Sequence, residues 1–294
     1  MWCETALSWR MARAAAASGV LAAALVASGC GSDGGPSGPV NTTPPESTNG
    51  IQWSKGRLWI ASIQGSQLIQ VDPESGQITQ GYGPEDGLGP NDDLVLVEGG
   101  AFVVTEPSRG TVSRFDPKRR VRTELGEIGP QANGITKCAD GRIYASLEWP
   151  VGGVFEIDPS GTTPPRQVTT QAPGLNSMGC LGDFLYAPTF FAGGVVRVNR
   201  QTGDVETIVE GGLNLPSAVH VTPDGSVVAL QVVLPVRLVK VDVETGALTE
   251  LARVEGMIAD NFAVGPDGTF YVTDFFDAGV VVISPDGSQR RIEL

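Results

Sequence analysis

From residue 49 to the C-terminus, short hydrophobic runs alternate with turn-forming residues, and this arrangement repeats. An apolar residue followed by Asp, or by a similar polar residue, and then by a turn occurs six times, at Val71-Asp72, Phe115-Asp116, Ile157-Asp158, Val198-Asn199, Val241-Asp242 and Ile283-Ser284. The successive spacings are 44, 42, 41, 43 and 42 residues. Several copies continue to Pro or Gly, which is typical of hairpin turns because Pro favours the first central position and Gly adopts positive φ.

Two further elements recur in step with this turn. Upstream of each turn, a turn residue precedes a strand-like run that begins at Gly56, Gly100, Gly141, Asp183, Gly225 or Gly268. Seven or eight residues before that, a polar residue followed by an apolar one opens each unit, at Asn49, Asp93, Asn133, Asn176, Ser217 and Asp260. We call these six residues the openers. Each unit therefore contains four strand candidates.

A repeat of 41–44 residues with four strands is typical of a propeller blade. We therefore predict an all-β, six-bladed β-propeller with four antiparallel strands per blade, because an ordinary sandwich would not repeat six times. The blades are predicted at about 49–90, 91–131, 132–174, 175–215, 216–258 and 259–294. The last blade has its own four strand candidates, so blade packing rather than a swapped strand is expected to close the ring.

The first 48 residues have a different pattern. Arg10 and Arg13 precede an apolar run over residues 14–27, which is too short to span a bilayer. Translation starts at Met1 or at Met11. We interpret 1–29 as a lipoprotein signal peptide, with Cys30 as the lipidated residue and 30–48 as a flexible Gly/Ser/Pro/Thr tether. The alternative is an ordinary secretory signal, which would make the protein secreted or periplasmic rather than lipid-anchored on the extracytoplasmic face of a bacterial membrane.

Charge and composition exclude several functions. The net charge of −13 argues against nucleic-acid binding, which needs clustered Lys and Arg. The chain has one histidine, His220, so a His-rich zinc site cannot form, and a Ser-His-Asp triad would depend on that residue. Cys138 and Cys180 remain in the exported domain, either as a disulfide or as two small buried side chains.

Candidate chemistry is expected at one mouth of the central channel, where loops from all blades meet. These loops are unusually aromatic for loops, and their candidate ligand-binding residues are Glu148, Trp149, Phe190, Phe191, Asp274, Phe275 and Phe276. Apolar side chains with carboxylates favour an organic ligand, including a cationic one. The alternative is that the aromatic side chains pack between blades or under neighbouring loops.

The openers are also candidates for a metal site. Oxygen ligands that converge on one axis suit a hard cation such as Ca²⁺, and we select Asn49, Asp93, Asn133, Asn176 and Asp260. The alternative is that these side chains cap turns through their own backbone.

Residues 49–294 resemble the six-bladed propellers of the SMP-30/gluconolactonase/LRE-like superfamily. They are also similar to NHL-type repeats. The resemblance rests on the phrases Asn133-Gly134-Ile135-Thr136, Pro223-Asp224-Gly225 and Gly265-Pro266-Asp267-Gly268. It implies a lactone hydrolase with a divalent metal held by a Glu near the start, two Asn, and an Asp that also acts as the base. Asn133 and Asn176 match the two Asn, whereas Asn49 replaces the Glu and Ser217 replaces the Asp.

Two functions follow. The first is an anchored, monomeric propeller that binds a small organic molecule or a protein without chemistry, and meets the membrane only through its lipid. The second is a metal-dependent lactone hydrolase with a rearranged site. Whether the protein is an enzyme stays open at this stage, with His220 and Asp260 as the catalytic candidates.

Overall fold

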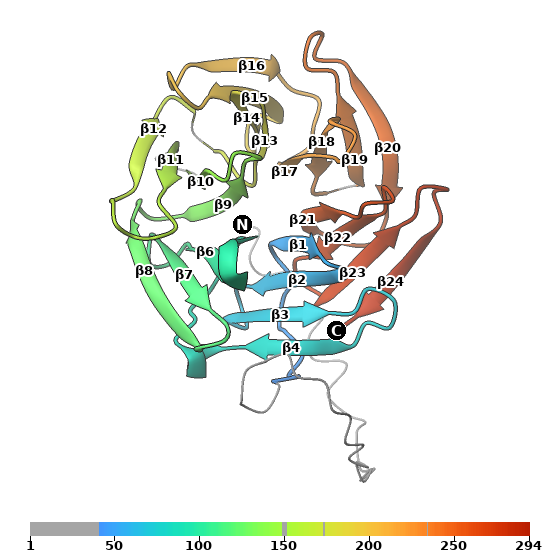
Figure 1. Cartoon of the computed structure of the whole chain (residues 1–294). Helices are drawn as coiled ribbons and strands as arrows, with labels where there is room; N and C mark the ends of the chain where they lie inside the picture. The colour runs from blue at the N-terminus through green and yellow to red at the C-terminus, as the bar shows by residue number, and fades with distance from the viewer. Residues whose placement is uncertain (1–40, 149–151, 173, 234) are drawn as a thin grey trace, which may run out of the picture. The chain divides into compact units, whose positions relative to one another are not determined.

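Each predicted repeat forms one four-stranded antiparallel sheet, which confirms the six-bladed propeller. The structure is a computed structural model that describes residues 41–148, 152–172, 174–233 and 235–294. Within every sheet the strands follow in sequence order, so the first strand lies nearest the channel and the fourth lies at the rim (Figure 1). No strand is exchanged between sheets among the described residues.

The strands of the first three blades have the following bounds: β1 Ile51–Ser54, β2 Arg57–Ser62, β3 Gln67–Val71 and β4 Ile78–Tyr82; β5 Leu94–Leu96, β6 Phe102–Glu106, β7 Thr111–Asp116 and β8 Val121–Glu127; β9 Ala132–Lys137, β10 Ile143–Leu147, β11 Gly153–Ile157 and β12 Arg166–Thr169. Two short 3-10 turns lie between these strands, η2 at Pro84–Asp86 and η3 at Glu98–Gly100.

The last three blades repeat the pattern: β13 Gly179–Leu181, β14 Phe184–Thr189, β15 Gly194–Asn199 and β16 Val205–Val209; β17 Pro216–Val221, β18 Val227–Gln231, β19 Val236–Val241 and β20 Leu248–Val254; β21 Ala259–Val264, β22 Phe270–Asp274, β23 Gly279–Ile283 and β24 Gln289–Glu293. Blades 1–6 are numbered in this order.

The recurring Asp or Asn of the repeat forms the turn between the third and fourth strands. In blade 1, Asp72 Oδ1 accepts hydrogen bonds from the backbone N–H groups of Glu74 and Ser75, both at 3.0 Å. The same geometry recurs at Asn199 and Asp242. A short acceptor side chain is what such a turn requires, because it satisfies two backbone donors that no strand partner can reach.

The hydrophobic core is divided into six clusters, one at each interface between neighbouring blades. A four-stranded sheet cannot bury both of its faces alone, so each blade packs on the next one. The cluster between blades 6 and 1 is as continuous as the others and includes Ile51 and Ile60 from blade 1 with Tyr271 and Ile292 from blade 6.

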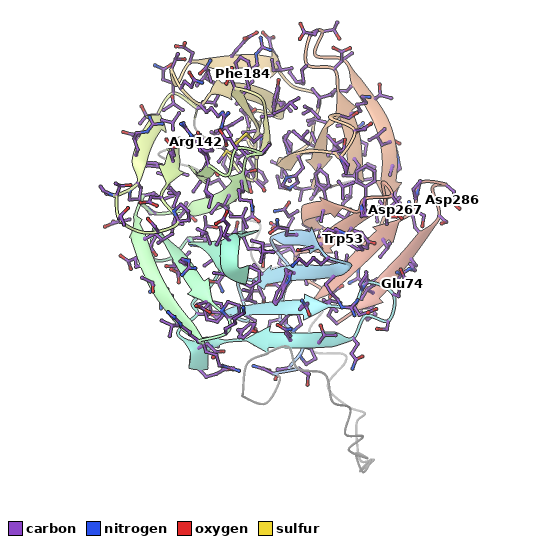
Figure 2. The ribbon with its side chains drawn as sticks, in the orientation of Figure 1. Trp53, Glu74, Arg142, Phe184, Asp267 and Asp286 are labelled. Atoms are coloured by element: carbon purple, nitrogen blue, oxygen red, sulfur yellow. A yellow bond between two sulfur atoms is a disulfide. The ribbon has the colours of Figure 1, made fainter. Side chains whose placement is uncertain are left out.

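Polar and aromatic contacts complete the closure of the ring. Trp53 of β1 stacks on Tyr271 of β22, with ring centroids 5.1 Å apart; Figure 2 labels Trp53. The Thr48 hydroxyl lies 2.8 Å from the backbone carbonyls of both Asp274 and Gly279 in blade 6. Packing and these hydrogen bonds therefore join the first blade to the last, as the sequence predicted for a ring without a swapped strand.

The propeller includes residues that the sequence assigned to the tether. The predicted tether extended to residue 48, yet Ser47 and Thr48 are fully buried. Ser47 Oγ donates to Asn49 Oδ1 at 2.9 Å, and Gln67 donates to the Thr43 carbonyl at 3.2 Å. The end of the predicted tether is therefore packed on blades 1 and 6. Cys30 and the predicted signal peptide lie outside the described residues, within which no helix has the length and apolarity needed to cross a membrane.

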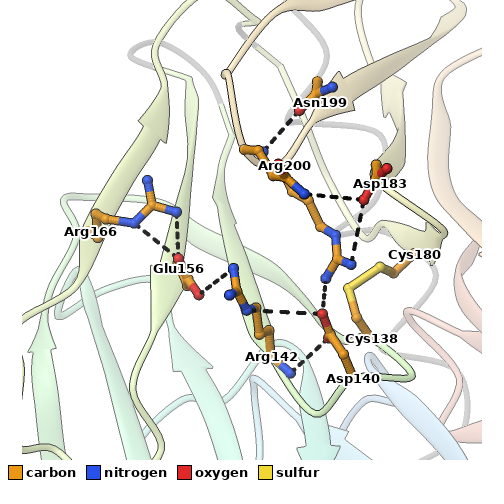
Figure 3. Close-up of polar contacts among 10 residues, drawn as sticks. Cys138, Asp140, Arg142, Glu156, Arg166, Cys180, Asp183, Asn199 and Arg200 are labelled. Carbon is orange, nitrogen blue, oxygen red and sulfur yellow. Dashed lines mark hydrogen bonds and ion pairs between the residues drawn. A yellow bond between two sulfur atoms is a disulfide. The ribbon is translucent and has the colours of Figure 1, made fainter.

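A disulfide links blades 3 and 4 beside their innermost strands, β9 and β13. Cys138 and Cys180 are bonded, with their Cα atoms 5.3 Å apart. Arg200 of blade 4 pairs with Asp140 of blade 3 at 2.5 Å beside this bond (Figure 3). The two cysteines thus form a covalent connection between blades rather than two independent core side chains.

The closure predicts that Thr273 is needed for stability. Its buried hydroxyl lies 2.8 Å from the Asn49 carbonyl across the junction of blades 6 and 1, and accepts a hydrogen bond from Asn261 N at 2.9 Å. Thr273→Val preserves shape but leaves these groups unpaired, so the free energy of unfolding should fall by about 1–3 kcal/mol in denaturant titrations. Thr207→Val, at an exposed position on β16, is the matched control and should change it by less than about 0.5 kcal/mol.

The disulfide predicts a second loss of stability. It closes a loop with a sequence separation of 42 residues, which restricts the unfolded chain. Replacing both cysteines by Ser should lower the free energy of unfolding by about 2–4 kcal/mol, and dithiothreitol should destabilise the natural protein but not this variant. Equal sensitivity of both proteins to dithiothreitol would contradict the assignment.

Candidate functional site

The six blades are joined around the channel through the backbone at the start of each blade. In every blade, one carbonyl accepts a hydrogen bond from the preceding blade: Asn49 from Thr273, Asp92 from Gly50, Asn133 from Thr105, Asn176 from Ser146, Ser217 from Ser177, and Asp260 from Ser217. Side-chain hydroxyls donate four of these bonds and backbone N–H groups donate two. This ring places the side chains of equivalent residues at one end of the channel.

The ring of hydrogen bonds between blades shows that the predicted opener of blade 2 was wrong by one residue. Asp92, and not Asp93, occupies the position equivalent to Asn133 and Asn176, because its carbonyl accepts the inter-blade bond at 2.7 Å. The spacings of the six structural openers then alternate as 43, 41, 43, 41 and 43 residues. This regular spacing is the sequence feature that could have distinguished Asp92 from its neighbour.

Asp93 lies one residue further along and has a structural role. Its Oδ2 accepts hydrogen bonds from Ile135 N at 3.1 Å and from Ser177 Oγ at 2.7 Å, and its Oδ1 accepts one from Leu94 N at 2.8 Å. The carboxylate thus joins blades 2, 3 and 4. Burial raises its pKa, while His220 and these donors act in the opposite direction.

A pocket of about 370 Å³ lies at the mouth of the channel. Its polar lining comes from Asp92, Gln131, Asn133, Glu148, Asn176, Ser217 and Asp260. Its apolar lining comes from Ile63, Pro107, Phe190, Leu215, Val232, Val233, Ile258, Ala259, Phe275 and Phe276. Polar groups at the channel with apolar walls are the usual composition of a site for a small organic ligand.

Most of the predicted loop residues meet at this pocket. Glu148, Phe190, Phe275 and Phe276 line it. Phe191 is 65% exposed and packs edge-on against Phe190 beside the pocket, with centroids 5.1 Å apart. Trp149 lies outside the described residues.

Asp274 does not line the pocket. It is buried, and its carboxylate pairs with Arg291 at 2.8 Å and accepts a hydrogen bond from Phe276 N at 3.2 Å. Its position next to two aromatic residues suggested a ligand contact, but the structure gives it the role of holding the loop that carries Phe275 and Phe276. The sequence did not identify Leu215 and Ile258 as wall residues, because isolated aliphatic side chains in loops carry no distinctive pattern.

Three carboxylates face the pocket and repel one another. Burial raises the pKa of Asp92 well above its usual value, and the charges of Asp260, Asp93 and Glu148 raise it further. Burial also raises the pKa of Asp260 to about 7, with additional contributions from Asp93 and Glu148. The pKa of Glu148 is raised by burial, against a hydrogen bond from Asn176. The channel mouth therefore binds protons more tightly than ordinary surface carboxylates do.

The residues do not fit the divalent metal that the resemblance implies. Asn49 Oδ1 already accepts hydrogen bonds from Ser47 Oγ and Ile63 N, both at 2.9 Å, and Asn176 Oδ1 accepts one from Ser177 N at 2.7 Å. Two of the three amide oxygens that would coordinate a metal therefore accept hydrogen bonds within the protein. Ser217 supplies a hydroxyl where the carboxylate is expected, and that hydroxyl donates to the Asp260 carbonyl.

The described part of the chain contains no cluster of three or more His, Cys, Asp or Glu side chains arranged to hold a metal ion. Asn133 differs from the other two amides, because its Oδ1 has no hydrogen-bond partner, while its Nδ2 lies 3.5 Å from Glu148 Oε2.

His220 is not one of the residues that line the pocket. Its Nε2 lies 2.8 Å from Asn261 Oδ1, which also accepts a hydrogen bond from Phe262 N at 2.8 Å. Since Oδ1 is an acceptor, the imidazole donates a hydrogen bond from Nε2. Burial lowers the pKa of His220, and its ring contacts Phe262 edge-on at 4.8 Å. Asp260, the other catalytic candidate, does line the pocket.

The crowded carboxylates predict a pH-dependent effect of Asp260→Asn. The pKa of Asp260 is about 7 in the folded protein and about 4 in an unfolded chain, so the folded state holds the proton more tightly between these values. The stability from this group is fully present below about pH 4 and is lost as the pH rises through 7.

Asp260→Asn should therefore raise the free energy of unfolding by about 1–3 kcal/mol near pH 8 and change it little near pH 4, measured by denaturant titration at both pH values. Asp277→Asn removes an exposed carboxylate from a neighbouring loop and is the control. An equal effect of Asp260→Asn at the two pH values would contradict the raised pKa.

This protein is similar to known proteins in its structure. No protein-family model and no curated protein matches the sequence. A gluconolactonase from Xanthomonas campestris superposes with a TM-score of 0.65 at 14% identity, over 79% of this chain and 84% of that one. Regucalcin from Agrobacterium tumefaciens, a calcium-binding protein, gives 0.63 at 17% identity, over 79% and 83%.

A virginiamycin B lyase from Staphylococcus aureus, in a structure with quinupristin, gives a TM-score of 0.63 at 15% identity, over 86% of this chain and 85% of that one. At these identities the likeness concerns the fold. The chain is therefore a six-bladed propeller that is similar in fold to the gluconolactonase, regucalcin and virginiamycin B lyase structures.

Proposed function

We propose that this protein is an exported, monomeric binding propeller that takes up a small organic molecule in the pocket at the channel mouth without chemical conversion. The observation that carries the proposal is the pocket itself, about 370 Å³, with Phe190, Phe275 and Phe276 on its walls and polar openers facing it. A volume of this size suits a small molecule better than a bare ion or an extended protein surface.

The predicted signal peptide and Cys30 support a cellular location for the protein. The apolar run and Cys30 are typical of a lipid-anchored bacterial protein, which would hold the pocket at the extracytoplasmic side of a membrane. The interblade disulfide supports export, because such bonds persist in oxidising compartments.

The departures from the hydrolase pattern support binding without catalysis. The two carboxylates of the family's metal site are replaced by Asn49 and Ser217, and the Asn49 Oδ1 and the Ser217 hydroxyl are hydrogen-bonded within the protein. His220 donates to Asn261 and does not line the pocket. The residues that would activate a water molecule in that pattern are therefore absent from their expected places.

A neutral, solvatochromic dye tests the pocket. Nile red should gain fluorescence with the natural protein, and Phe276→Ala should weaken its binding about fivefold, because the side chain loses apolar contact worth about 1 kcal/mol. Val121→Ala removes an equally exposed hydrophobic residue from β8, outside the pocket, and should have no effect. Absence of dye binding, or equal effects of the two substitutions, would contradict the proposed pocket.

A second candidate is a lactone hydrolase with a rearranged metal site. One observation favours it: Asp260, with a pKa of about 7, lines the same pocket as Glu148, and a carboxylate in this range is suited to act as a general base. A panel of lactones, assayed with and without Ca²⁺, Mn²⁺ and Zn²⁺ and after chelation, separates the two candidates. Binding without chemistry predicts no turnover, whereas chelator-sensitive hydrolysis that Asp260→Asn abolishes would establish the hydrolase.

A further inference from the structure

The pocket has a charge that the protein does not balance. Asp92, Glu148 and Asp260 line it, and none of its described lining residues is Lys or Arg. Elsewhere the same protein neutralises a buried carboxylate thoroughly: Glu106, with a fully buried side chain, pairs with Arg122 at 2.5 Å and Arg109 at 2.7 Å. Asp92 is buried and Glu148 and Asp260 are half-buried, and a charge withdrawn from water is costly without a partner, so the contrast indicates that the partner of the pocket carboxylates comes from outside the chain.

An unpartnered acceptor points to the same place. Asn133 is 7% exposed and lines the pocket, and its Oδ1 accepts no hydrogen bond. Its Nδ2 lies 3.5 Å from Glu148 Oε2, which places the amide beside a carboxylate. A buried amide oxygen without a donor is uncommon, and a ligand carrying N–H groups would satisfy it together with the carboxylates.

The apolar walls of the pocket indicate that the ligand also has an apolar, organic part. Phe190, Phe275 and Phe276 line the pocket with aliphatic neighbours, and Phe276 is 48% exposed. Aromatic rings attract cations through their faces and also bury apolar surface. A metal ion would use neither property, and the amide oxygens of Asn49 and Asn176 that it would need already accept hydrogen bonds.

We infer that the ligand is an organic ammonium compound, whose cationic nitrogen lies among Glu148, Asp260 and Asn133 and whose apolar body packs on the phenylalanine walls. This inference rests on the proposed binding function and specifies its ligand class. The acidic residues supply attraction and exclude anions, while the aromatic residues supply contact with the carbon skeleton.

Three probes with one skeleton test the charge preference. Phenethylammonium is a cation, 2-phenylethanol is its neutral analogue, and phenylacetate is the anion. Isothermal titration of the natural protein near pH 8, where the amine stays protonated, should give at least about tenfold tighter binding of phenethylammonium than of 2-phenylethanol, and no binding of phenylacetate.

Matched variants assign the preference to the pocket. Asp260→Asn and Glu148→Gln should each weaken phenethylammonium about tenfold and change 2-phenylethanol less than about twofold. Phe276→Ala should weaken both probes. Asp277→Asn, which removes an exposed carboxylate from the neighbouring loop, is the control and should change neither.

The outcomes separate this inference from the proposed function. If 2-phenylethanol or phenylacetate binds as tightly as the cation and Phe276→Ala still weakens binding, the pocket stands and the ammonium inference is overturned. If Ca²⁺ binds in the pocket and displaces phenethylammonium, the carboxylates form a metal site and the inference is also overturned. If none of the three probes binds up to about 10 mM and Nile red gains no fluorescence, both the inference and the proposed pocket fail.

Discussion

Six backbone carbonyl groups, one at the start of each blade, accept hydrogen bonds from the preceding blade, and the rest of the molecule depends on this ring. It determines the radial position of every sheet, so the core can divide into six equivalent interfaces. Because each of these residues accepts the bond through its backbone carbonyl, its own side chain does not have to take part, except at Ser217, whose hydroxyl donates to the Asp260 carbonyl. Asp92, Asn133 and Asp260 can therefore differ while the architecture is kept.

The freedom of these side chains explains the chemistry at the channel mouth. Two of the six structural openers carry carboxylates, and Glu148 adds a third from the end of the neighbouring strand β10. Burial raises the pKa values of all three, and neighbouring carboxylates raise those of Asp92 and Asp260 further. Such an arrangement destabilises the free protein, and the organic cation that we propose as the ligand would compensate it, because perturbed carboxylates of this kind are concentrated at functional sites.

The architecture could be predicted from the sequence because it depends on repeated local features. The Asp72 turn and its equivalents recur at nearly constant spacing, and each needs only its own neighbouring backbone groups. The two cysteines, 42 residues apart, occupy neighbouring blades for the same reason. The pocket walls were predicted in part, since aromatic residues in loops such as Phe190 and Phe276 are unusual enough to be noticed.

The site could not be predicted in full, because its details depend on contacts between distant segments. Asp92 and Asp93 are adjacent, and only the inter-blade bonds show which of them faces the mouth. The sequence predicts Asp274 as a ligand contact because it does not show that Asp274 pairs with Arg291. Ser47 and Thr48 have the composition of a tether, yet Thr48 is held by blade 6, more than two hundred residues away.

The most direct test of this account is a carbon-13 NMR titration of the side-chain carboxyl groups in the ligand-free protein, with Asp260 assigned through Asp260→Asn. The account predicts that the Asp260 carboxyl titrates near pH 7, because burial and its acidic neighbours oppose its ionisation. Titration at about pH 4, the ordinary value for aspartate, would show that the channel mouth carries no uncompensated charge and would contradict the account.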